Sequence, residues 1–135
     1  MRINSDGLRD REHTRQKSPN TLRIAVLGDS FTEARQVPLE DAYWTVMADS
    51  LQSCPALDGN GVEVINFGVS GYGTLQELLT LRHYVWNYNP DVILLAFFTG
   101  DDVQNNFRPL EQHALRPFAS LQNGEPVFDA FFTFH

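Results

Sequence analysis

The chain has 135 residues, of which 42% are hydrophobic and 20% charged, and this ordinary composition excludes a collagen, a disordered tail and a disulfide scaffold. Its 10 basic and 17 acidic side chains give a net charge of −7, so we expect no nucleic-acid partner. The single cysteine, Cys54, excludes an internal disulfide and a cysteine-based zinc site. No apolar run is long enough to span a membrane, and the polar start lacks the apolar core of a signal peptide.

The first half of the chain predicts an arm, a strand and a helix. Residues 1–21 are polar, rich in arginine and without hydrophobic periodicity, which predicts an extended, solvated arm. Residues 22–28, "LRIAVLG", form a short aliphatic run that stops at a glycine, as a buried strand does. Pro38 then precedes a helix expected over residues 39–53, where apolar side chains recur at helical spacing.

The second half continues the alternation of strands and helices. "VEVINF" (62–67) and "DVILLAFF" (91–98) are predicted strands. Between them, Thr74 and Glu77 predict a capping box that opens a helix with one apolar face, formed by Leu75, Leu78, Leu79, Val85 and Trp86. This order predicts an α/β fold with parallel strands. Further on, Asn123-Gly124 between two strand-like runs predicts a hairpin.

The loops that follow the three strands are the candidate functional segments, because ligands of open parallel sheets bind at the carboxyl ends of the strands. Their sequences are "GDSFTE" (28–33), "NFGVSGYGT" (66–74) and "FTGDDVQNN" (98–106). A tight turn at Ser30 would expose its hydroxyl and leave backbone N–H groups free to bind an anion, as a nucleophilic serine requires. Gly71 could offer a further unobstructed N–H, and Asp29 is expected to shape the turn rather than transfer a proton.

These three blocks, in this order and spacing, resemble the SGNH hydrolases, also called the GDSL esterase and lipase family. The similarity covers residues 4–106, since "INSDGLRDRE" also resembles the segment before the first block in many bacterial members. It implies a three-layer, flavodoxin-like parallel sheet of strand order 2-1-3-4-5. It also implies an ester hydrolase that acts on a small-molecule substrate, with neither a cofactor nor a metal ion. Export is typical of those bacterial members.

Carried over residue by residue, the resemblance implies that Ser30 is the nucleophile and donates its backbone N–H to the oxyanion hole, and that Gly71 gives the second N–H. The family's third donor is an asparagine, but this position is Asp101, followed by Asp102. An ionised carboxylate has no proton to donate. The site is therefore expected either to be impaired or to exclude water around Asp101 and keep it protonated.

The family's Asp-x-x-His motif, which supplies the general base, has no counterpart here. The histidines are His13, His83, His113 and His135, and none has an acidic residue three positions before it in a suitable strand and helix context. His13 does follow Asp10 by three positions, but both lie in the polar arm, outside such a context. We therefore expect the chain to be the amino-terminal part of a longer enzyme, with little or no activity of its own.

The expected organisation is an arm (1–21), the first part of an SGNH-like α/β domain (22–106) and a truncated insertion or loop segment (107–135). The third strand would lack a neighbour, so its apolar edge is expected to pair with another chain. Two alternatives stay open. One is a non-catalytic α/β module that binds an acyl or sugar ligand, and the other is a magnesium-dependent phosphotransfer domain that uses Asp29, Asp101 and Asp102.

Overall fold

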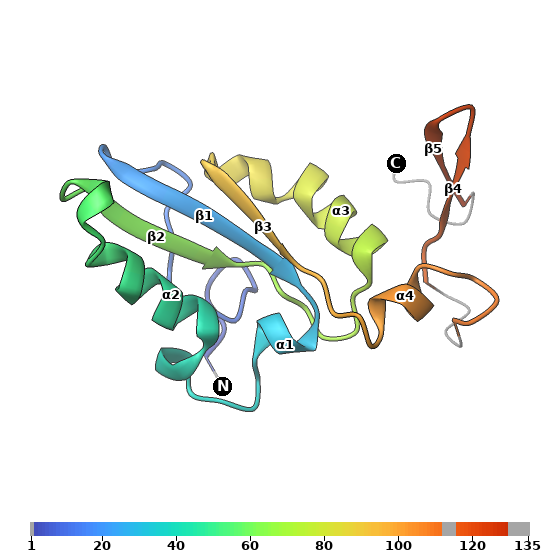
Figure 1. The fold of residues 1–135 in the computed structure, drawn as a ribbon, viewed down its shortest axis with the longest axis horizontal. Helices are drawn as coiled ribbons and strands as arrows, with labels where there is room; N and C mark the ends of the chain where they lie inside the picture. Colours follow the sequence, from blue (N-terminus) through green and yellow to red (C-terminus); the bar gives the residue numbers. More distant parts are fainter. Residues whose placement is uncertain (1, 112–115, 130–135) are drawn as a thin grey trace.

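The computed structural model of the chain describes residues 2–111 and 116–129, and a three-stranded parallel sheet forms its centre (Figure 1). Strand β1 (Thr21–Gly28) lies in the middle, between β2 (Gly61–Asn66) and β3 (Val92–Ala96). Both neighbours run parallel to β1. The predicted α/β class with a parallel sheet is therefore confirmed, and the arrangement is consistent with part of a flavodoxin-like fold.

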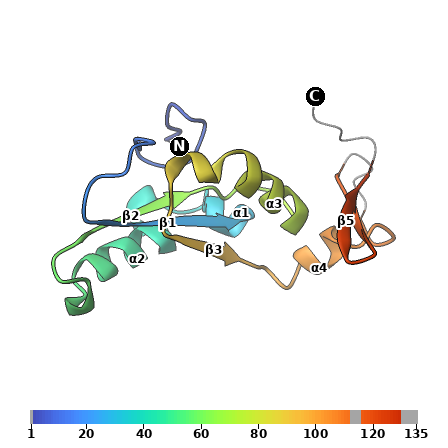
Figure 2. The same ribbon diagram turned by 90° about the horizontal axis from the view of Figure 1, so that it is seen from above.

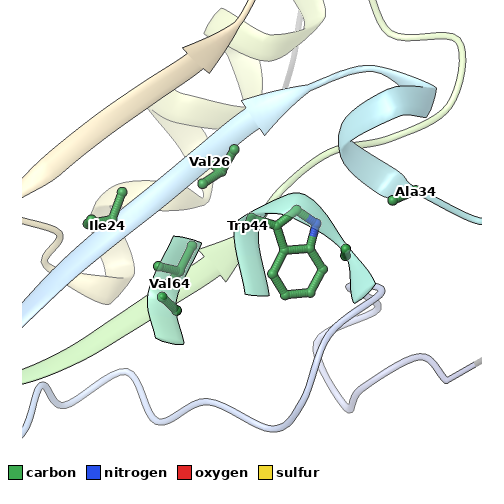
Figure 3. Close-up of a cluster of buried hydrophobic side chains, with 7 residues drawn as sticks. Ile24, Val26, Ala34, Trp44 and Val64 are labelled. Carbon is green, nitrogen blue, oxygen red and sulfur yellow. The ribbon is translucent and has the colours of Figure 1, made fainter. Parts of the chain in front are cut away.

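Helices cover the two faces of the sheet, which gives three layers (Figures 1 and 2). Helix α2 (Tyr43–Gln52) packs on one face, where Trp44 lies against Val26 and Val64 (Figure 3). Helix α3 (Thr74–His83) covers the other face, together with a 3₁₀ turn, η3 (Val85–Tyr88). Because side chains alternate along a strand, β1 supplies both layers of the core. Ile24 and Val26 face α2, whereas Ala25 and Leu27 face α3.

Both predicted helices are shorter than expected. Residues 39–53 divide into a 3₁₀ turn, η1 (Leu39–Asp41), and α2, because Ala42 between them has an extended backbone with ψ of 135°. Helix α3 ends at His83, so the expected apolar face does not reach Trp86, which is exposed. The predicted capping box at Thr74 and Glu77 is wrong. Gly73 is the N-cap, and its N–H donates to Gln76 Oε1 at 3.2 Å.

The remaining elements are short. A 3₁₀ turn, η2 (Pro55–Leu57), precedes β2, while α1 (Ser30–Glu33) and α4 (Asp102–Asn105) follow β1 and β3. Strands β4 (Ala119–Gln122) and β5 (Glu125–Phe128) form an antiparallel hairpin that projects away from the sheet (Figure 1). Asn123 and Gly124 connect them with φ of 54° and 84°, the left-handed pair that a tight hairpin turn requires, so this prediction is confirmed.

The expectation that the first residues form a solvated arm is wrong for several of their side chains. Asn4, Arg9 and Asp10 are all buried. Arg9 Nη1 donates to the carbonyl oxygen of Glu33 at 2.9 Å, and Asp10 Oδ2 accepts the N–H of Asn66 at 2.8 Å. Residues 2–20 contain no helix or strand, yet hydrogen bonds to distant residues hold this segment against α1 and β2.

A series of charged side chains also connects the segment before β1 to the amino-terminal halves of β1 and β2. His13 Nδ1 lies 2.7 Å from Glu63 Oε1, and its Nε2 lies 3.1 Å from Asp10 Oδ2. The other oxygen of Glu63 accepts Arg23 Nε at 2.6 Å. Burial alone would lower the pKa of His13, but the hydrogen bonds and charges of Asp10 and Glu63 raise it overall. His13 thus joins the arm to β2 best when both ring nitrogens carry protons.

This arrangement makes stability depend on pH. The folded-state pKa of His13 lies above its ordinary value of 6.5, so its contribution is fully present below pH 6.5 and is lost as the pH rises through the folded-state pKa. We expect the free energy of unfolding, measured by urea denaturation, to decrease across that range. In His13→Gln this decrease should be absent, whereas His83→Gln, at an exposed site in α3, should keep it. An unchanged pH profile in His13→Gln would contradict the assignment.

One edge of the sheet has no partner in the part of the chain that the structure describes. Strand β3 pairs with β1 alone, and its Val92, Leu94 and Leu95 side chains are exposed. Self-association through this edge stays a prediction. Among the described residues, no helix has the length and apolar character needed to cross a membrane.

Candidate active site

The first candidate loop turns directly from the central strand into a short helix. Helix α1 begins at Ser30, one residue after Asp29, and the Ser30 residue is partly exposed. Asp29 is buried and caps the helix, because its Oδ1 accepts the N–H of Phe31 at 2.9 Å. The carboxyl group of Asp29 therefore shapes the turn that presents Ser30.

Two glycines allow the loops after β1 and β2 to meet at Thr32, which is fully buried. A Cβ on Gly28 would lie 2.2 Å from Thr32 Oγ1, and a Cβ on Gly68 would lie 2.6 Å from Thr32 Cβ. Neither distance is possible for a real side chain, so both positions require glycine. The absence of side chains at these two glycines therefore allows α1 to pack closely against the second loop.

Gly71 lies in the second loop, close to the end of α1. It has a φ of +80°, which favours glycine, and the space where a Cβ would lie is open. The preceding residue, Ser70, donates its N–H and its hydroxyl to Glu33 Oε2, and the N–H contact measures 2.8 Å. Burial would raise the pKa of Glu33, but these hydrogen bonds and the charge of Arg35 hold it below its ordinary value. An ionised Glu33 therefore joins the loop of Gly71 to the helix of Ser30.

The third loop gives its two acidic residues opposite environments. Asp102 is fully buried, and its Oδ2 accepts the N–H of Phe98 at 2.6 Å. Asp101 is exposed and does not cap α4 with its side chain. The expectation that water is excluded around Asp101 is thus wrong, because the buried carboxyl belongs to Asp102. Phe98 also contacts the first loop, since its ring centroid lies 4.6 Å from that of Phe31.

Sequence reasoning missed a buried carboxyl group, Glu77, which was expected only as a member of the capping box with Thr74. It is 1% exposed, and neither of its carboxyl oxygens has a hydrogen-bond partner among the described residues. Burial, with the charges of Asp102 and Asp29, raises its pKa to about 7. Burial and the charges of Asp29 and Asp101 also raise the pKa of Asp102. A detectable signal existed in the sequence, because Glu77 shares a helix face with Leu81, four residues later.

The other candidate groups do not meet Ser30. His13 contacts Glu63, which lies opposite Arg23 in the sheet, and Gly28 is five residue steps further along β1 than Arg23, about 16 Å of strand. His113 and His135 lie outside the described residues. Within residues 2–111 and 116–129, no group of three or more His, Cys, Asp or Glu side chains could hold a metal ion. Asp29, Asp101 and Asp102 therefore do not form the magnesium site of the phosphotransfer alternative. The roles of Ser30, Gly71 and Asp101 stay predictions.

Comparisons with known proteins give limited support. No family model matches the chain, and no solved structure matches it. The chain is similar to an arylesterase from Vibrio mimicus, with 29% identity over 82 residues, which are 61% of this chain and 39% of the arylesterase. It thus spans about two fifths of the length of this relative. The similarity is weak evidence for an esterase and is consistent with the resemblance seen in the sequence.

Proposed function

We propose that this chain carries the nucleophile and part of the oxyanion hole of a serine-dependent ester hydrolase of the SGNH type. The observation that carries the proposal is the position of Ser30. It is the first residue of a helix, at the carboxyl end of the central strand, and the loop that contains Gly71 is bonded to the same helix. The similarity to an arylesterase supports the reaction class.

In the proposed reaction, Ser30 Oγ attacks the carbonyl carbon of the ester and gives its proton to a general base. The negative charge that develops on the carbonyl oxygen is stabilised by the backbone N–H groups of Ser30 and Gly71. The protonated base then gives this proton to the leaving oxygen as the tetrahedral intermediate collapses, which releases the alcohol, frees the base and leaves an acyl group on Ser30. Water, activated by the same base, then attacks this acyl-enzyme and frees the carboxylic acid.

The general base of this proposal is a histidine outside the 135 residues. His13 is engaged by Asp10 and Glu63, and no other histidine of the sequence follows an aspartate by three positions. Without a base, binding and oxyanion stabilisation would give only a small part of the rate. A chain that spans 39% of the arylesterase leaves room for such a residue elsewhere in the complete protein.

Covalent labelling tests the proposal. We expect a fluorophosphonate probe to modify the complete protein once, at Ser30, because only a serine beside a base and an oxyanion hole reacts readily with such reagents. Tryptic peptides analysed by mass spectrometry would locate the label. Ser70, whose hydroxyl donates to Glu33, serves as the internal control and should stay unmodified. A complete protein that stays unlabelled while binding acyl or sugar ligands would favour the non-catalytic alternative.

A further inference from the structure

We infer that Glu33 is a positioning residue that fixes the second oxyanion donor, the N–H of Gly71, relative to Ser30. The inference rests on the proposed function and adds a residue to it. Glu33 contacts neither Ser30 nor Gly71 through its carboxylate. It acts through Ser70, which precedes Gly71 in the chain.

The carboxylate of Glu33 is placed to connect the two loops. Helix α1 begins at Ser30 and ends at Glu33, so both residues belong to one rigid turn. The Glu33 residue is 7% exposed, and its Oε2 accepts both the N–H and the hydroxyl of Ser70. Its Oε1 pairs with Arg35 Nε at 2.9 Å. Hydrogen bonds to an ionised acceptor are about twice as strong as neutral ones, so the Glu33 carboxylate holds Ser70 strongly.

The loop that contains Gly71 needs a contact at Ser70 such as the one that Glu33 makes. Upstream, the N–H of Val69 donates to the carbonyl oxygen of Gly28 at 3.0 Å, which fixes the start of the loop. Gly71 itself is exposed and has a left-handed backbone, with open space beside it. Its N–H belongs to the peptide group that follows Ser70. The orientation of this N–H therefore depends on how firmly Ser70 is held, and Glu33 holds it at two atoms.

A residue with this role should affect the transition state more than the bound substrate. A displacement of about 1 Å in a catalytic group costs roughly 100-fold in rate, similar to the loss of one oxyanion donor. Substrate in its ground state does not carry the developing charge, so its binding should change little. We therefore expect the effect of Glu33 on kcat rather than on KM.

The test uses the complete protein and p-nitrophenyl acetate. We expect Glu33→Ala to lower kcat by about 100-fold with KM changed less than about 3-fold. Binding of a boronic acid, which forms a tetrahedral adduct with the serine, should weaken by the same factor as kcat. Glu33→Gln, which keeps an acceptor oxygen, should recover much of the lost rate. Glu40→Ala, at an exposed position in η1, is the matched control and should behave as the original protein.

Two further variants complete the design. Ser70→Ala removes the hydroxyl contact and keeps the N–H contact, so its loss of kcat should be smaller than that of Glu33→Ala. The double variant, Glu33→Ala with Ser70→Ala, should lose no more kcat than Glu33→Ala alone if both residues act through one contact. Should Glu33→Ala fail to fold, Ser70→Ala still measures the effect. Unchanged kcat in Glu33→Ala, or in Ser70→Ala if Glu33→Ala does not fold, with Ser30→Ala inactive, would overturn the role of Glu33 alone. Full activity in Ser30→Ala would overturn the proposed function instead.

Discussion

Replacing Ser30 by alanine is expected to lower the hydrolysis of p-nitrophenyl acetate by the complete protein by about 10⁴-fold or more. The reason is that Ser30 Oγ forms the covalent bond to the acyl group, and no other group at this turn can take its place. The backbone N–H of residue 30 remains in the variant, so substrate should still bind with little change in KM. Initial rates over a range of substrate concentrations would measure both parameters.

A matched serine control is available in α2. Ser50 lies on the exposed surface of α2, where its hydroxyl donates to the carbonyl oxygen of Val46 at 2.8 Å. Ser50→Ala should therefore keep full activity. Equal turnover in Ser30→Ala and Ser50→Ala would eliminate the serine mechanism, and with it the family assignment.

The change of Asp101 to asparagine is expected to raise the rate of the complete protein by roughly 100-fold, the value of one oxyanion donor. An asparagine amide donates two hydrogen bonds, whereas an ionised carboxylate donates none and repels the developing oxyanion. Asp101 is exposed and its side chain does not cap α4, so the substitution should leave the fold intact. Comparison of kcat/KM for the two proteins would measure the gain.

The control for this gain is Asp58→Asn, which makes the same chemical change at an exposed turn after η2. It should leave the rate unchanged. If Asp101→Asn also leaves the rate unchanged, Asp101 does not lie in the oxyanion hole and the alignment of the third block with the family pattern is wrong. A lower rate would mean that the carboxylate of Asp101 has a role that an amide cannot perform.

The sheet could be predicted from the sequence because its signals are local. β1 and β2 start one residue before the predicted runs, since short aliphatic stretches that end in glycine or a polar turn mark their own limits. The hairpin at Asn123 and Gly124 was predictable for the same reason. Helix limits were less accurate, because tertiary contacts and the backbone at Ala42 and Tyr84 decide them.

The parts that could not be predicted depend on residues far apart in the sequence. Glu33 and Ser70 are separated by 37 positions, and His13 and Glu63 by 50. No periodicity or composition reveals such pairs, because each partner alone has the sequence character of a solvated polar residue.

The two edges of the sheet differ in a way that limits how copies of this chain could join. On the outer side of β2, the N–H groups of Val62 and Asn66 donate to the side chains of Gln52 and Asp10, each at 2.8 Å. These bonds occupy backbone donors that a further strand would need. The edge of β3 has no such cover among the described residues. Among the described residues, β3 is therefore the open edge of the three-stranded sheet, and pairing of two copies through it would produce a closed twofold pair rather than an open-ended fibre.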